Sequence, residues 1–137
     1  MLSKTVFMAT ILAAAMAQGP RTCFQGNNGV GAAPATDCAQ FITGFCSDAA
    51  ASQIPVRVND STSRCFNLPD GDRCDLTAFN TYSRDSAPSG TNCVTVMTDL
   101  AANCNLGGFG KINNSTVYTF TIDRNHGVCK QGVQAGS

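Results

Sequence analysis

The sequence predicts an α+β fold, a disulfide-stapled sandwich in which an antiparallel sheet of about four to five strands packs against two amphipathic helices. Two segments repeat apolar residues at the helical period, several shorter segments alternate apolar and polar residues, and eight cysteines occur among 137 residues. The expected order is strand, helix, strand, strand, helix, strand, which matches a split β-α-β arrangement or a rearrangement of it.

The first helix is expected in TDCAQFITGFCSDAA, residues 36–50, with Thr36 or Asp37 as its N-cap. The second is expected in SGTNCVTVMTDLAANCNLGG, residues 89–108, and the glycine pair at its end should terminate it. Each segment places its cysteines on the same stripe as its large apolar side chains. The cysteines of both helices should therefore face the core.

The expected strands are RTCFQG (21–26), IPVRVND (54–60) continued by STSRCFN (61–67), CDLTAFNTY (74–82) and VYTFTID (117–123). In the last of these, apolar residues alternate with Thr119, Thr121 and Asp123. Strands with one apolar and one Thr-rich face predict an antiparallel sheet that helices cover on one side.

The first 17 residues have the pattern of a signal peptide. Residues 1–17 contain one lysine, then the apolar run VFMATILAAAMA, and they end in the small-x-small triplet Ala15-Met16-Ala17. This run is too short for a permanent membrane anchor. We expect cleavage after residue 17 and a secreted, extracellular chain with a single cysteine-rich domain, residues 18–137.

The composition of the chain argues against several classes of function. Without Lys4, the mature chain has eight Lys plus Arg against nine Asp, a balance near −1 that gives no general electrostatic attraction to nucleic acid or acidic membranes. The chain has no Glu and a single His, His126, which an exposed Asn-His-Gly turn should hold. General acid and base groups are therefore scarce, and we expect a protein without enzymatic activity and without a cofactor.

An even number of cysteines in a small secreted chain predicts four disulfides. Zinc binding is the competing interpretation, but no two cysteines have the two-residue gap of a zinc knuckle, so no metal is expected. Cys38 and Cys46 are about 12 Å apart along a helix, too far to bridge, and each helix should therefore be tied to other elements. The cysteines are Cys23, Cys38, Cys46, Cys65, Cys74, Cys93, Cys104 and Cys129.

SRCFNLPDGDRCD, residues 63–75, is expected to form a hairpin whose tip is a type I turn at residues 68–71. With Pro69 and Asp70 as the two loop residues, Cys65 and Cys74 fall opposite each other and could form a disulfide. A bulge at Gly71 would shift the register by one residue and remove this pairing.

The same hairpin is the candidate ligand site. It is either an ordinary solvated turn or a rigid polar loop of the kind that suits sugars, whose hydroxyls need fixed planar donors and acceptors. The apolar face of a sugar ring would need an aromatic side chain such as Phe66, Phe79 or Tyr82. The candidate glycan-binding residues are Asn67, Asp70, Asp72, Arg73 and Tyr82.

Several blocks together resemble a known family: TCF, CAQFITGFC, SRCFNLPDGDRCD followed by AFN, GGFG and FTIDRNHGVC. In this combination they are similar to the small secreted glycan-binding proteins of mushrooms, the lectins sometimes called the Y-three family. The resemblance implies a non-enzymatic lectin with an α/β/α sandwich, a homodimer whose two sheets join, and fucosylated GalNAc and GlcNAc glycans as ligands. It assigns no individual binding residue. An exposed sheet edge is a reasonable dimer contact because its backbone groups lack partners.

Two other classes remain open. One is a cysteine-rich effector or defence protein that acts on a protein or membrane target, and the other is a hydrolase that uses Asp70 and Asp75 as paired carboxylates. The spacing of the tip aspartates does not match a calcium loop, so glycan binding should be independent of metal. Sequons at Asn59, Asn113 and Asn114 fit a secreted chain.

Overall fold

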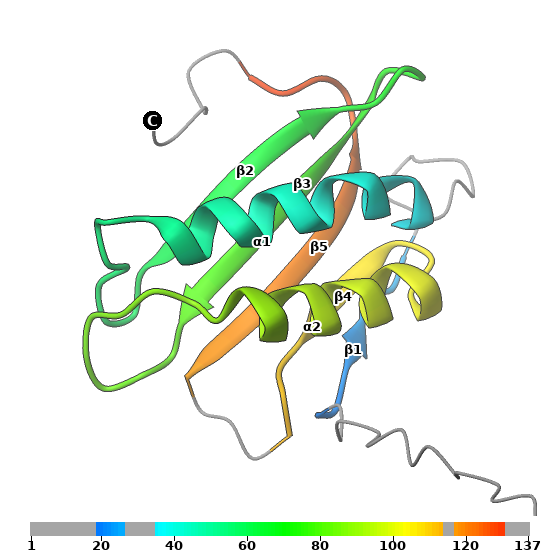
Figure 1. Cartoon of the computed structure of the whole chain (residues 1–137). Helices are drawn as coiled ribbons and strands as arrows, with labels where there is room; N and C mark the ends of the chain where they lie inside the picture. Colours follow the sequence, from blue (N-terminus) through cyan, green and yellow to red (C-terminus); the bar gives the residue numbers. More distant parts are fainter. Residues whose placement is uncertain (1–18, 27–34, 114–116, 131–137) are drawn as a thin grey trace, which may run out of the picture.

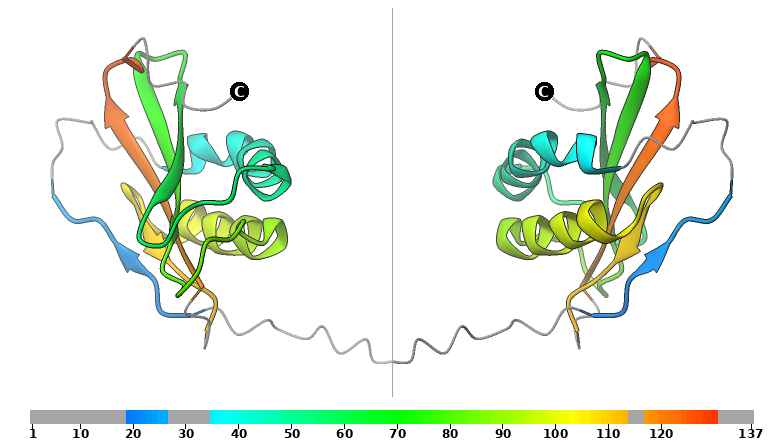
Figure 2. Two further views of the ribbon diagram at one scale, coloured as in Figure 1. Left: turned by 90° about the vertical axis from the view of Figure 1, so that its left-hand side faces the viewer. Right: turned by 90° about the vertical axis from the view of Figure 1, so that its right-hand side faces the viewer.

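The structure, a computed structural model, describes residues 19–26, 35–113 and 117–130. Five strands form one sheet, and both helices pack on the same face of it (Figures 1 and 2). The predicted α+β class is confirmed. In chain order the elements are β1 (Thr22–Cys23), the 3-10 helix η1 (Ala35–Phe41), α1 (Ile42–Ala51), β2 (Ser61–Asn67), β3 (Asp72–Asn80), α2 (Gly90–Asn103), β4 (Gly107–Gly110) and β5 (Tyr118–His126).

The sheet order is β1-β4-β5-β3-β2, and every neighbouring pair is antiparallel. Because β3 and β4 both run antiparallel to the β5 strand between them, they are parallel to each other, and α2 connects them. This unit is the predicted split β-α-β arrangement. In the same way, α1 connects β1 and β2, which are parallel strands at opposite edges of the sheet.

Three expectations about the elements were wrong. Residues 54–60 form only an isolated bridge between Val56 and Ser86, and Asn59 has a φ of 59° that interrupts extended backbone. The chain forms an additional strand, β4, in a glycine-rich segment that was predicted only to terminate the second helix. The α/β/α sandwich implied by the resemblance is a two-layer arrangement here, because both described helices lie on one face (Figure 2).

The first predicted helix begins as η1 and becomes α-helical only at Ile42. Asp37, one of the two expected caps, directs its carboxylate to Arg124 of β5 instead of to the helix amides. The second predicted helix begins at Gly90, where the Ser89 hydroxyl caps it by accepting a hydrogen bond from the amide of Asn92.

The core lies between the helices and the sheet. Leu76, Phe120 and Ile122 from the sheet pack with Met97 and Leu100 from α2, and all five side chains are at most 2% exposed. Such burial is the main favourable contribution to folding.

Four disulfides tie the elements together. They join Cys23 to Cys104, Cys38 to Cys74, Cys46 to Cys93, and Cys65 to Cys129. As expected, no bridge closes within a helix: one joins α1 to α2, one joins η1 to β3, and one fixes the end of α2 to β1. The remaining bridge attaches the segment after β5 to β2.

The predicted bridge between Cys65 and Cys74 was wrong. Cys65 lies opposite Asp75, while Cys74 lies opposite Phe66, so the two cysteines point to different faces of the hairpin. The cause is a three-residue loop with a bulge at Gly71, whose φ is 89°. The amide of Leu68 donates to the carbonyl of Asp72 over 2.8 Å and closes this longer loop.

Candidate functional site

Four of the five predicted glycan-binding residues come together at the tip of the β2–β3 hairpin, beside the end of β5. These are Asn67, Asp70, Asp72 and Arg73. The fifth, Tyr82, follows Asn80 at the opposite end of β3, about 26 Å from the tip at the rise of a strand. Its ring stacks on Arg84, whose guanidinium carbon lies 4.9 Å from the ring centre. Tyr82 therefore belongs to another part of the surface.

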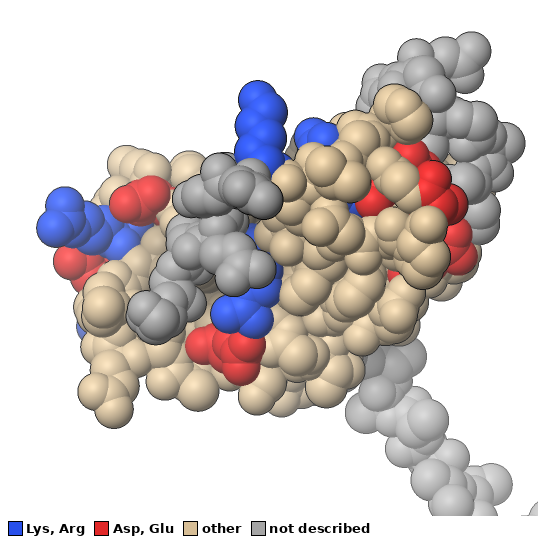
Figure 3. Space-filling model, turned by 90° about the horizontal axis from the view of Figure 1, so that it is seen from above, with Lys and Arg blue, Asp and Glu red and all other residues tan. Residues whose placement is uncertain are grey.

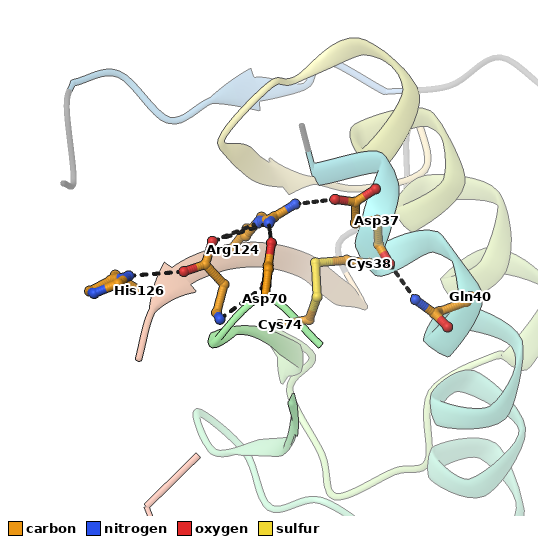
Figure 4. Close-up of polar contacts among 8 residues, drawn as sticks. Asp37, Cys38, Gln40, Asp70, Cys74, Arg124 and His126 are labelled. Atoms are coloured by element: carbon orange, nitrogen blue, oxygen red, sulfur yellow. Dashed lines mark hydrogen bonds and ion pairs between the residues drawn. A yellow bond between two sulfur atoms is a disulfide. The ribbon is translucent and has the colours of Figure 1, made fainter. Parts of the chain in front are cut away.

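On the helix-covered face, the tip is organised around Arg124 of β5, whose side chain is 0% exposed. It forms ion pairs with Asp37 of η1 and with Asp70 and Asp72 of the hairpin, as Figure 4 shows for the labelled residues. The Arg124–Asp72 pair measures 3.1 Å. A buried guanidinium needs such carboxylate partners. The predicted residues Asp70 and Asp72 thus hold the hairpin tip against β5 and η1.

The charged groups of this cluster shift one another's pKa values. His126 Nδ1 lies 2.9 Å from Asp72 Oδ1. This hydrogen bond, together with the Arg124 contacts, lowers the pKa of Asp72 although burial opposes the shift. For Arg124, burial acts to lower the pKa, but hydrogen bonds to Asp37 and Asp72 outweigh it and the net direction is upward.

Asp37 and Asp70 also reach the surface, since 52% of each side chain is exposed. Figure 3 shows a group of acidic side chains on one side of this view, while acidic side chains elsewhere in it lie beside Lys or Arg. Within the described ranges, no group of three or more His, Cys or Asp side chains could hold a metal ion. At the tip, the Arg124 guanidinium occupies the space between the carboxylates that a cation would need.

The other face of the sheet, which we call the open face, is covered by neither α1 nor α2 (Figure 2). Residues that lie directly opposite each other on paired strands point to the same face. From β2, β3 and β5 the open face therefore receives Ser61, Ser63, Cys65, Asn67, Arg73, Asp75, Thr77, Phe79, Thr119, Thr121, Asp123 and Asn125. Most of these side chains donate or accept hydrogen bonds.

At the tip end of the open face, the polar groups are held in place. Asp75 Oδ2 accepts hydrogen bonds from Arg73 Nε over 3.0 Å and from Asn125 Nδ2 over 2.9 Å. Arg73 Nη1 also donates to the carbonyl of His126 over 2.8 Å. Asn67 Oδ1 accepts from the amide of Cys129 over 2.6 Å, which fixes the segment after β5. Fixed donors and acceptors of this kind suit the recognition of hydroxyl groups.

Asp123, on the open face, has a carboxylate oxygen that lacks a hydrogen-bond partner among the described residues. Asp123 lies opposite Asp75 on β3, and this oxygen, Oδ1, is buried. Burial raises the pKa of Asp123, a hydrogen bond with Asn125 opposes this shift, and the neighbouring charge of Asp75 adds to it. A buried carboxylate oxygen without a hydrogen-bond donor lowers the stability of the folded state.

The three aromatic residues named from the sequence lie in different environments. Phe66 stacks on Phe41 with ring centres 4.5 Å apart, on the helix-covered face. Phe79 belongs to the open face and is 37% exposed, but it lies at the end away from the tip. Sequence reasoning missed Phe109 of β4, which is 42% exposed and also points to the open face.

Sequence reasoning also missed Arg124, Asp123 and Asn125. The alternation of TIDRNH could have identified them. Ile122 and Arg124 point to one face of the strand, and Asp123 and Asn125 point to the other. Using this alternation requires the register that places β5 beside β3, and that register follows only from the assembled sheet.

The described residues also form a groove between α1 and α2, lined by small side chains that include Ser47, Ala50 and Val94. No charged side chain is among the residues that line it. The groove offers fewer fixed hydrogen-bonding groups than the open face does.

The sequons fall on the surface where the structure describes them. Asn59 is exposed in the turn before β2, and Asn113 is exposed after β4. Asn114 and the predicted signal peptide lie outside the described residues. Glycosylation at the two described positions stays a prediction.

Fold and site together define a small disulfide-bonded α+β protein. Its hydrogen-bonding groups are held in fixed positions on a sheet face that neither described helix covers, a surface suited to ligands rich in hydroxyls. Residues 37–129 match the family described as glycan binding domain Y3. A relative from Coprinus comatus, named antiviral protein CAP, is 42% identical over 97 residues, which is 67% of this chain and 90% of the relative. The chain belongs to the Y3 glycan-binding domain family, and the resemblance seen in the sequence is confirmed.

Proposed function

We propose that this protein is a secreted lectin that binds fucosylated GalNAc- and GlcNAc-type glycans without catalysis. Membership of a glycan-binding family over residues 37–129 is the main support. The open face adds a physical basis, because it presents amide, guanidinium, carboxylate and hydroxyl groups in fixed positions. The name of the relative is consistent with a defensive role for such binding.

Two observations support secretion. The eight cysteines form four disulfides, which persist in oxidising compartments. The sequence also begins with the pattern of a signal peptide, residues 1–17. Among the described residues, no helix has the length and apolar character needed to cross a membrane.

The arrangement of the aspartates supports a non-catalytic role. Asp70 reaches Arg124 on the helix-covered face, while Asp75 lies on the open face. The two carboxylates that a hydrolase would pair are therefore separated by the sheet. His126, the single histidine of the chain, is hydrogen bonded to the structural carboxylate of Asp72.

A glycan array with the disulfide-intact mature chain tests this function. We expect saturable binding to a narrow set of fucosylated GalNAc/GlcNAc glycans that persists in a chelator and is lost after reduction. An array without specific binding would contradict the proposal and would favour the effector class, with a protein or membrane target. Loss of binding in the chelator would contradict its metal independence.

We also propose a homodimer that joins two sheets through β2. This strand has seven residues and lies at one edge, whereas β1 at the other edge has two. A longer edge offers more unpaired backbone groups to a second copy. This part of the proposal is tested separately below.

A further inference from the structure

We infer that a sugar ring binds on the open face between Phe109 of β4 and Asp123 of β5, rather than on the hairpin loop. This inference rests on the proposed glycan binding and assigns it a place. Phe109 lies opposite Thr121, and Asp123 lies two residues farther along β5 on the same face. Such diagonal neighbours lie roughly 7–8 Å apart, within reach of one ligand ring.

Phe109 provides an apolar platform. Its side chain is 42% exposed although it is large and apolar, and its ring centre lies 6.2 Å from that of Phe24 at a tilt of 46°. The neighbouring ring restricts the orientation of Phe109. Exposed aromatic rings with a fixed orientation bind flat apolar surfaces, and one face of a pyranose ring, lined with C–H groups, is such a surface.

The position beside Asp123 on β4 has no side chain. Gly107 pairs with Asp123, has a φ of 86°, and could not accept a Cβ, which would lie 2.0 Å from the carbonyl oxygen of Ile122. The amide of Phe24 donates to the carbonyl of Gly107 over 3.0 Å, which holds the next strand segment beside it. The backbone of β4 therefore lies close to β5 here, and β4 places no side chain beside Asp123.

The neighbouring part of β5 is polar. The side chain of Asp123 is partly exposed, although its Oδ1 atom is buried, and Asn125 and Arg73 lie next to it around Asp75. Sugar hydroxyls donate hydrogen bonds to carboxylates, and an N-acetyl carbonyl accepts from amide or guanidinium groups. The combination of an aromatic ring with a hydrogen-bonding carboxylate fits a neutral N-acetylated or fucosylated pyranose.

The test compares variants with a fluorescent fucosylated GalNAc–GlcNAc glycan as the probe, in a solution binding assay on the disulfide-intact chain. We expect Phe109→Leu, which keeps apolar bulk but removes the ring, and Asp123→Asn each to weaken binding about tenfold or more. Phe109→Tyr should retain binding because it keeps the ring. Phe79→Ala is the control, since Phe79 is a phenylalanine of similar exposure on the same face.

The outcomes separate this inference from the proposed function. If wild type binds and Phe109→Leu and Asp123→Asn bind equally well, the inference is wrong while the lectin function stands. Loss of binding in Phe79→Ala, or in Asn67→Ala alone, would likewise place the sugar elsewhere. A wild-type protein that binds no glycan would overturn both. The thermal unfolding transition of each variant shows whether it is folded. If a variant is misfolded, Thr121→Arg replaces it, because an arginine at this position should block the same space.

Discussion

At the residue scale, one buried arginine decides what the hairpin tip does. Arg124 brings Asp70 and Asp72 of the hairpin and Asp37 of η1 to a single point. The aspartates that looked like binding residues in the sequence therefore act as partners of a buried charge. The open face of the sheet, where we propose that the ligand binds, instead carries Arg73, Asp75, Asp123 and Asn125.

Arg124→Met should lower the free energy of unfolding by about 3 kcal/mol or more, because it leaves the buried carboxylate of Asp72 without its cation. Urea unfolding with the disulfides intact measures this. Arg64→Met is the control, since Arg64 and Asp48 form an exposed pair whose loss should cost about 1 kcal/mol or less. Equal effects of the two substitutions would show that the Arg124 cluster contributes no special stability.

Asp72 and Asp123 should give opposite pH dependences. The pKa of Asp72 is lowered in the folded state, so its stabilisation is present above the unfolded pKa of about 4 and is lost as pH falls through the lower folded value. Asp72→Asn should thus be less stable than wild type at pH 7 and lose less stability on acidification.

The pKa of Asp123 is raised in the folded state, so its contribution to stability is present below about pH 4 and is lost as pH rises through the folded value. Asp123→Asn should therefore be slightly more stable than wild type at pH 7, with the difference vanishing below about pH 4. Unfolding free energies across this range measure both variants. A loss of stability in Asp123→Asn at pH 7 would contradict the unfavourable position of this carboxylate.

At the element scale, much of the fold could be predicted and the pairing of its parts could not. The end of β2 and the two helical segments follow from the local turn residues and from apolar residues at the helical period. The strand β4 could not be found in this way, because GGFG is short and glycines rarely favour strands. The partner of Cys65 could not be predicted either, because the bulge shifts the register of β3 by one residue. This shift places Asp75, and not Cys74, opposite Cys65.

Two glycine substitutions test the bulge. Gly71→Ala meets no atom within 4 Å but forces a side chain into a φ of 89°, so it should destabilise the protein by about 1 kcal/mol. Gly44→Ala also meets open space, but it lies within α1 and should stabilise by about 0.5–1 kcal/mol. Thermal unfolding compares the two. A stabilising Gly71→Ala would contradict the bulged turn.

At the scale of the whole molecule, disulfides connect segments that are distant in the sequence. The bridges span separations of 36 to 81 residues and fix the helices on one face of the sheet. Each contributes about 2–4 kcal/mol by restricting the unfolded chain. Neither helix covers the other face, and this is the polar sheet surface on which we propose that the ligand binds.

The proposed dimer has a specific test at the edge of β2. Leu68 donates to Asp72, and Asn80 donates to Asp60, so even-numbered residues of β2 bond to β3 and the amide of Ser63 points outward. Ser63→Pro should convert the dimer to a monomer with a small loss of stability, because it removes the outward amide and the hydrogen bond between the Ser63 and Thr77 hydroxyls but no backbone bond to β3. Thr62→Pro, the control, should destabilise the hairpin. Sedimentation showing a monomeric wild type would contradict the dimer.

The most direct test of the central claim is an NMR titration of the isotope-labelled, disulfide-intact protein with a fucosylated GalNAc–GlcNAc glycan. We predict saturable shifts confined to the open face, centred on Phe109, Asp123 and Asn125, with no changes in the groove between α1 and α2. The absence of any shift at millimolar glycan would contradict the lectin function. Shifts confined to the helices would contradict the open face as the binding surface.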